Sequence, residues 1–252
     1  MFWEKILLVL LFFLPVQIGR HFWSGYSFIF GLRIDYLATT VYLQDVLIVL
    51  LLSFWLPKNY EKLFFGKRLI FWFLLLFLAI VNIVFSQNAS LSFFSWLRVV
   101  EMALLGAMVA IEPIKIYRKL RFILPGIVLF EFLLGVCQVV IQSSLGGIFW
   151  LLGERSFDIA TPGIARASWL GEVFLRPYGT FSHPNSLAGF ILVCLVLLLG
   201  SQPLLKKGKA AVIGGLVLII ICFSRVVWLS AVLLGLGYLF YKFSFSSLTT
   251  FN

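Results

Sequence analysis

Long apolar runs recur along the whole chain and leave little room for a water-soluble fold. Hydrophobic residues make up 62% of the sequence and charged residues only 12%, about half the charged share of a soluble domain. A run of about 20 apolar residues crosses the hydrocarbon core of a bilayer as a helix. The sequence therefore predicts an all-α fold, a polytopic bundle of transmembrane helices that forms a single integral membrane domain over residues 1–252.

Eight apolar segments are candidates for membrane crossings. Several are shorter than the ~20 residues of a full crossing. The first segment resembles a signal peptide but has no small-x-small cleavage site, so we expect an uncleaved helix. The predicted spans are approximately residues 6–19, 41–56, 68–86, 93–111, 121–142, 185–200, 210–223 and 226–241.

The basic residues predict the orientation of these spans. Short loops rich in lysine and arginine stay in the cytoplasm, and the loops 57–68, 112–121 and 201–209 alternate as cytoplasmic loops should. The N-terminus is then cytoplasmic, and the net charge of +10 reflects membrane orientation rather than nucleic-acid binding. The predicted outer side holds no lysine, and its arginines are Arg20, Arg33, Arg155, Arg166, Arg176 and Arg225.

This excess of arginine on one side is informative because orientation alone does not distinguish arginine from lysine. The planar guanidinium group holds phosphate or carboxylate through two parallel hydrogen bonds, which lysine does not. Contact with lipid headgroups explains Arg20 or Arg33 individually, but the set as a whole predicts an anionic ligand at the outer face. We expect the long external segment 143–183 to lie in the membrane interface as short helices and turns.

The segment that follows Arg176 predicts a helix start suited to an anion. Ser182 or His183 can cap the helix and Pro184 fits its first turn. The unpaired amides and partial positive charge of a helix N-terminus attract anions. We expect Arg176 to contact the ligand and Asn185 to be structural or to hydrogen-bond a sugar. His183 is either a general base or only the cap.

Ser224 and Arg225 repeat this arrangement after the next short span. An arginine at such a position is costly unless it meets a partner or a wet cavity. We therefore expect Arg225 either to contact the ligand or to pair with an acid such as Glu172 or Asp158.

The charged residues well inside the fourth and fifth predicted spans are Arg98, Glu101 and Glu131. They predict a buried ionic cluster that holds helices together, with a proton or ion path as the alternative. Two histidines without paired cysteine or carboxylate spacing predict no metal site.

A longer motif resembles a known family. The run Arg-Pro-Tyr-Gly-Thr-Phe-Ser-His-Pro-Asn-Ser-Leu-Ala begins at Arg176 and is followed, one helix hairpin later, by Ser224-Arg225. Upstream stand Leu-Gly-Glu-Arg-Ser-Phe at 152–157 and Thr-Pro-Gly-Ile-Ala at 161–165. Together, these motifs resemble the bacterial O-antigen ligase and O-antigen polymerase family over roughly residues 145–230.

The resemblance implies a metal-independent glycosyltransferase of the bacterial inner membrane that needs no cofactor and acts at the outer face. Such enzymes transfer a glycan from undecaprenyl diphosphate to a lipid, a growing glycan or a protein. Arg176 and Arg225 would hold the donor diphosphate, and we assign Asn185, Ser224 and Arg155 to the same substrate site. Whether the chain is a ligase or a polymerase stays open, as do its glycan and acceptor.

The chain departs from the family in length. Members usually have about a dozen spans and a large outer loop with a histidine proposed as the base, whereas this chain stops at Asn252. It is then a fragment, which we favour, or it needs a second polypeptide, or His183 substitutes as the base.

Two other functions compete with this one. The first is a flippase or transporter of an anionic lipid-linked sugar, because arginine-lined cavities suit it too. The second is a polyprenyl-phosphate-sugar glycosyltransferase that uses Asp35 in the first outer loop.

Overall fold

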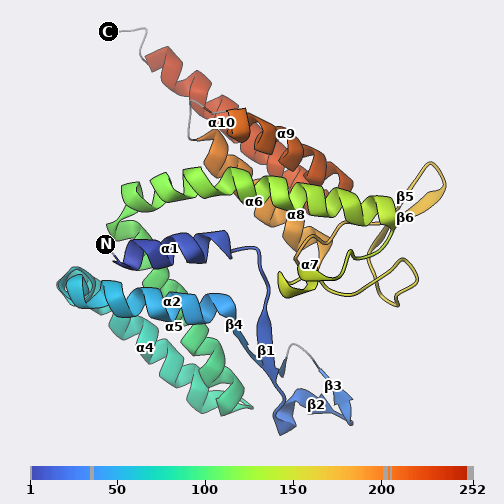
Figure 1. Ribbon diagram of the computed structural model, residues 1–252. Helices are drawn as coiled ribbons and strands as arrows, with labels where there is room; N and C mark the ends of the chain where they lie inside the picture. Colours follow the sequence, from blue (N-terminus) through green and yellow to red (C-terminus); the bar gives the residue numbers. More distant parts are fainter. Residues whose placement is uncertain (1, 35–36, 201–203, 205, 249–252) are drawn as a thin grey trace. The chain divides into compact units, whose positions relative to one another are not determined.

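The computed structural model describes residues 2–34, 37–200, 204 and 206–248, and these are mostly helical (Figure 1). They form two compact units, Met1–Leu14 with Ile18–Leu120 (unit 1) and Pro15–Gln17 with Arg121–Asn252 (unit 2). The described residues also contain three two-stranded sheets, which the all-α expectation did not include.

Each of the eight predicted apolar segments overlaps a helix. Three of these helices, α4, α5 and α6, are long and apolar enough to cross a membrane, which indicates a membrane protein. The helix α8 and the stretch 225–240 of α10 are apolar but shorter, so the eight-span bundle stays a prediction. The helices are α1 (Phe2–Phe12), α2 (Leu43–Trp55), α3 (Tyr60–Phe64), α4 (Lys67–Phe85), α5 (Ala89–Ile111), α6 (Pro113–Ile141), α7 (Ile148–Leu151), α8 (Pro184–Leu199), α9 (Lys206–Ile221) and α10 (Arg225–Leu248).

Several helix boundaries differ from the prediction, and two of them have a clear cause. The first helix ends at Phe12 rather than near residue 19, because Pro15 has no N–H to donate and disfavours helical geometry in the residue before it. The helix α6 begins already at Pro113, a residue well suited to a first helical position. The basic residues predicted for the loop 112–121 therefore lie mainly on this helix.

Unit 1 is built mainly from the helices α1, α2, α4 and α5, which pack against one another in pairs. In Figure 1, α1 lies beside α2, and α5 packs against both α2 and α4. The buried residues of α2 include Ile48, Leu51 and Trp55, which recur at helical spacing. Only 6% of the most apolar window of α4 is buried, against 39% in α6. Most of the apolar surface of α4 is therefore left for lipid.

Two small hairpins with matching turns interrupt the helical pattern. In unit 1, β2 (Phe28–Ile29) pairs with β3 (Leu32–Arg33). In unit 2, β5 (Arg166–Trp169) pairs with β6 (Glu172–Leu175). Both turns have two residues with positive φ, Phe30-Gly31 and Leu170-Gly171, as a type I′ hairpin turn requires. The third sheet pairs β1 (Gly19–Phe22) with β4 (Thr39–Tyr42) in unit 1.

Unit 2 brings α8, α9 and α10 side by side (Figure 1). Two adjacent glycines of α9 permit the close approach of its neighbours. A Cβ on Gly214 would lie 3.0 Å from the ring of Phe132 on α6, and one on Gly215 would lie 2.8 Å from Leu195 on α8. Small residues at such contacts are typical of packed membrane helices.

The segment 143–183, which the sequence predicts to be external, is held to α6 by buried polar side chains. Gln138 of α6 accepts hydrogen bonds from the backbone N–H groups of Tyr178 and Gly179 at 2.9 and 2.8 Å. Its amide donates to Glu154 at 2.8 Å. The segment contains the β5–β6 hairpin as well as the short helix and turns that the sequence predicts.

Candidate functional site

A hollow of about 540 Å³ in unit 2 gathers most of the predicted site residues. It is bordered by β5, by the start of α8 and by the turn between α9 and α10. Its polar lining comes from Arg166, Ser168, Arg176, Asn185, Ser224 and Arg225, and its aromatic lining from Phe223 and Trp228. We call it the arginine hollow.

Arg176 links two helix ends. Its Nε donates to the carbonyl oxygen of Cys222 at 2.7 Å, and its Nη2 donates to Oδ1 of Asn185 at 2.6 Å. A guanidinium group carries five N–H donors, so others are left for a ligand. Burial lowers the pKa of Arg176, yet an arginine stays protonated at neutral pH.

Ser224 and Arg225 occupy the sharp break between α9 and α10. Phe223 has φ of 50°, a left-handed conformation that a bulky residue rarely adopts. The carbonyl of Ser224 accepts the N–H of Trp228 at 3.0 Å, which makes Ser224 the cap residue of α10. Its hydroxyl is buried and has no hydrogen-bond partner among the described residues. A buried polar group without a partner is rare and indicates a site for a further group.

Two of the three arginines have no partner, and none of the three pairs with an acid among the described residues. The exposed side chains of Arg166 and Arg225 form no hydrogen bond or ion pair with any residue that the structure describes. In particular, Oδ1 of Asp158 accepts from Ala160 and Thr161 within its own turn. None of the described lining residues is acidic. The hollow is therefore strongly positive.

Arg166 reaches this hollow from β5. The sequence places it among the outer arginines but gives no reason to join it to Arg176, because its position depends on a hairpin that was not predicted. Leucine at the first position of the turn is not one of the residues that mark a type I′ hairpin, so no local pattern could have revealed it.

His183 and Arg155 are not among the lining residues of the arginine hollow. His183 caps α8, where its Nδ1 accepts the N–H of Asn185 at 3.1 Å. Burial, and then the positive charge of Arg176, lower the pKa of His183, so the ring is neutral at neutral pH. Arg155 Nη1 donates to the carbonyl of Ser182 at 3.4 Å. The role of His183 as a base stays a prediction.

Glu131 anchors the loop that carries the motif. Its Oε2 accepts the backbone N–H of Thr180 at 3.1 Å, and its Oε1 lies 2.7 Å from the hydroxyl of Thr180. Gly179 has φ of 57°, and a Cβ there would collide with Oε2 of Glu131. The predicted ionic cluster is therefore wrong for Glu131, which has no cationic partner among the described residues. Arg98 pairs with Asp45 at 2.9 Å.

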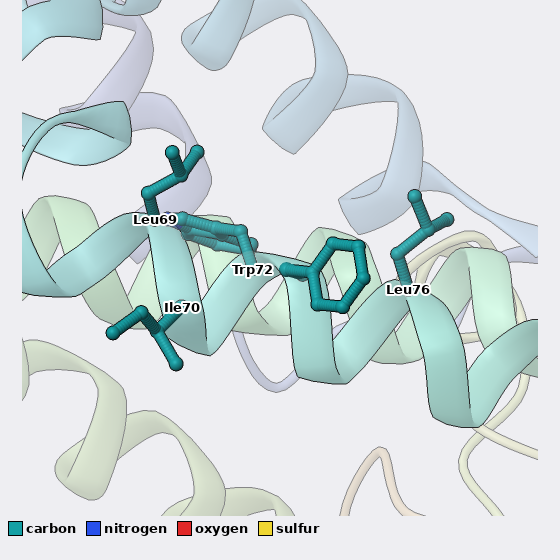
Figure 2. A pocket seen from close by; sticks show the side chains of 5 residues that line it. Leu69, Ile70, Trp72 and Leu76 are labelled. Carbon is teal, nitrogen blue, oxygen red and sulfur yellow. The ribbon is translucent and has the colours of Figure 1, made fainter.

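A second hollow lies on α4 and differs from the arginine hollow because its lining is entirely apolar or aromatic. Figure 2 shows the side chains that line it, which come from α4 alone. They include Leu69, Trp72 and Leu76, and all are apolar or aromatic. Such a surface matches bilayer hydrocarbon and offers no group for chemistry.

Two other predictions concern Asp35 and a metal site. Asp35, the acid of the alternative glycosyltransferase, lies outside the described residues. Within the described ranges, no group of three or more metal-ligating side chains comes together.

Comparison of the chain with known proteins identifies no relative. No protein-family model matches the chain, and no curated protein or solved structure matches it significantly.

Proposed function

We propose that the arginine hollow binds the diphosphate of a lipid-linked glycan, and that the chain is a glycosyltransferase of the O-antigen ligase or polymerase type. The observation that carries the proposal is that Arg176 and Asn185 of the motif line one hollow together with Arg225, which comes from a separate stretch of sequence. The family resemblance assigns Arg176 and Arg225 to the donor diphosphate, and Asn185 was expected to be structural or to hydrogen-bond a sugar.

The chemistry of transfer needs the positive charge that this hollow offers. The bond between the anomeric carbon of the glycan and the diphosphate oxygen breaks, and the acceptor hydroxyl bonds to that carbon and loses its proton. Negative charge grows on the departing diphosphate, and preorganised donors stabilise it most where charge develops. Arg176 is held in place by two hydrogen bonds, and Arg225 and Ser224 have donors without partners among the described residues.

The proposal includes the partners and the location. The donor is an undecaprenyl-diphosphate-linked glycan, and the acceptor is a glycan, a lipid or a protein. The reaction takes place at the outer face of the bacterial cytoplasmic membrane, with the N-terminus in the cytoplasm. For His183 to act as the base, its Nδ1 must release the N–H of Asn185, because a neutral ring that accepts there carries its proton on Nε2.

Arg225→Ala is the sharpest test, because the side chain of Arg225 makes no hydrogen bond or ion pair within the described structure. Purified protein is given a polyprenyl-diphosphate-linked glycan, and both binding and glycan transfer are measured. We expect transfer to fall about 100-fold, as when one oxyanion donor is lost. Arg118→Ala removes an exposed arginine outside the hollow and is the matched control.

Two outcomes would count against the proposal. Transfer by Arg225→Ala at the wild-type rate would refute the donor site. Movement of the lipid-linked glycan across proteoliposomes without turnover would favour the transporter instead.

A further inference from the structure

The turn of the β2–β3 hairpin in unit 1 is apolar and open. It consists of Ile29, Phe30, Gly31 and Leu32, which we call the hairpin tip. Phe30 is fully exposed, and Leu32 and Ile29 are 70% and 45% exposed. A single exposed apolar residue is ordinary on a protein surface, but a contiguous group of them indicates a surface that meets a partner.

Hydrogen bonds at the base of the hairpin hold the hairpin tip in place. Ser27 is buried, its hydroxyl donates to the carbonyl of Leu37 at 3.1 Å, and its carbonyl accepts the N–H of Ile34 at 2.9 Å. The hydroxyl of Tyr26 lies 3.0 Å from Oγ1 of Thr39 on β4. The hairpin is therefore bonded to its neighbouring strand, and the exposure of its tip belongs to the folded unit.

The backbone of Phe30 is strained. Its φ is 51°, and at this position of a type I′ turn glycine, asparagine and aspartate are the favoured residues. Because the ring is fully exposed, no packing within unit 1 offsets the cost of this conformation. A bulky apolar residue in a strained and exposed position suggests a functional contact rather than a contribution to folding.

The hairpin lies near the end of a helix that is suited to cross the membrane. Arg98, in the first half of α5, donates to the carbonyl of Thr40 on β4 at 2.7 Å. Thr39, one residue further from α2, lines a groove together with Leu91, close to the start of α5. The hairpin lies beyond Thr39, at the end of the β1–β4 sheet that is remote from α2 (Figure 1). Since α5 is long and apolar enough to span the hydrocarbon core, the hairpin reaches the headgroup region at its start.

Arginine and aromatic side chains lie next to the hairpin tip. The guanidinium carbon of Arg33 is 4.4 Å from the centre of the Trp23 ring, and that of Arg20 is 5.6 Å from the centre of the Phe22 ring. Residues 19–34 contain no acid. Aromatic rings concentrate at the membrane interface, and arginines there extend their charged ends towards the headgroups.

We propose that the hairpin tip inserts into the bilayer interface beside α5. Ile29, Phe30 and Leu32 lie among the upper parts of the acyl chains. Arg20 and Arg33 lie at the level of the lipid phosphates, which accept hydrogen bonds from them.

The size of the hairpin tip favours a lipid leaflet over a protein partner. Its three apolar side chains offer about 600 Å² in total, even at about 200 Å² each, a value typical of an aromatic side chain. A stable protein interface buries about 800 Å² on each partner. A lipid leaflet needs no such minimum area, because α4 and α5 already hold the chain in the membrane.

Fluorescence quenching of the intact chain in vesicles tests the proposal. Phe30→Cys is made together with Cys137→Ser and labelled with bimane, because Cys137 is exposed whereas Cys194 and Cys222 are buried. The vesicles contain phosphatidylcholine brominated near the ester end of its acyl chains. We expect the brominated lipid to remove most of the bimane emission and aqueous iodide to remove little. Gln87→Cys, in the exposed turn between α4 and α5, is the matched control and should show the opposite pattern.

Leu32→Asp, added to the protein labelled at residue 30, tests whether the apolar side chains drive the insertion. Leu32 is exposed, so the substitution leaves the core of unit 1 intact. A carboxylate is costly in the hydrocarbon region. Iodide should then quench the label at residue 30 as strongly as the label at residue 87.

Three results would overturn the proposal. Equal iodide quenching at residues 30 and 87, with leucine at position 32, would show that the hairpin tip lies in water. Protection from iodide without quenching by brominated lipid would show that a protein surface, such as a second copy of the chain, covers it. Unchanged quenching by brominated lipid in Leu32→Asp would show that the apolar side chains do not hold the tip in the bilayer. None of these readouts depends on the arginine hollow, because no glycan is present.

Discussion

The arginine hollow of unit 2 and a groove of unit 1 that is lined by Asp45, Arg98 and Glu101 have similar volumes, about 540 and 560 Å³, but their charged residues are paired differently. In the first, Arg166 and Arg225 have no acidic partner among the described residues. In the second, Asp45 neutralises the one arginine and Glu101 is left over. Size therefore does not distinguish the two sites. What distinguishes them is the charge that remains after internal pairing, which is clearly positive only in the arginine hollow.

Reversing one charge in the arginine hollow should have the largest effect, and the quantity affected is the rate of glycan transfer. Arg225→Glu places an acid beside Arg166 and Arg176 and makes the hollow resemble the groove. We expect transfer from a polyprenyl-diphosphate-linked glycan to fall by about 1000-fold, the upper range for loss of one oxyanion donor. The same reversal at Arg118, outside the hollow, should change little. Similar rates for both variants would show that the charge of the hollow is irrelevant.

Removing the hydroxyl of Ser224 should have a smaller and more selective effect. Without ligand, Ser224→Ala should leave the melting temperature unchanged or slightly raised, because a buried hydroxyl without a described partner is removed. Affinity for a polyprenyl diphosphate should fall about five- to tenfold if the hydroxyl donates to it. Thermal melts at increasing ligand concentration measure both quantities.

Ser230→Ala is the matched control for this variant. The hydroxyl of Ser230 already donates to the carbonyl of Val226 at 2.9 Å. An affinity loss that is equal in the two variants would remove Ser224 from the site.

The smallest predicted effect is the pH dependence of the stability that His183 contributes as the cap of α8. Burial and the charge of Arg176 lower the pKa of His183 in the folded state. Its contribution to stability is therefore fully present above the unfolded pKa, about 6.5, and is lost as pH falls through the lower folded value. The ring is exposed, so solvent screening limits the loss to at most about 1 kcal/mol.

His183→Asn isolates this contribution, because asparagine caps a helix without titrating near neutral pH. Unfolding midpoints of both proteins are compared between pH 8 and pH 4.5. The wild type should lose more stability in acid than the variant, and parallel profiles would show that His183 does not titrate with folding.

Local signals predicted the helices well and the strands poorly. The start of α8 follows from His183-Pro184, a cap residue before a proline. The β5–β6 hairpin depends on positive φ at Leu170, which leucine rarely adopts and which the sequence does not announce. Arg166 was therefore missed as a lining residue, although it had been grouped with the outer arginines.

The sequence by itself determined that the chain contains helices apolar enough for a membrane, and it singled out the polar residues with functional potential. Hydropathy and capping depend on residues within a few turns of one another, so they can be read along the chain. Only the tertiary structure decided which polar groups meet. Arg176 binds the carbonyl of Cys222, 46 positions away, and Arg98 pairs with Asp45, 53 positions away, rather than forming the predicted cluster. Pairing of charges depends on how the helices pack, and packing is a property of the folded chain.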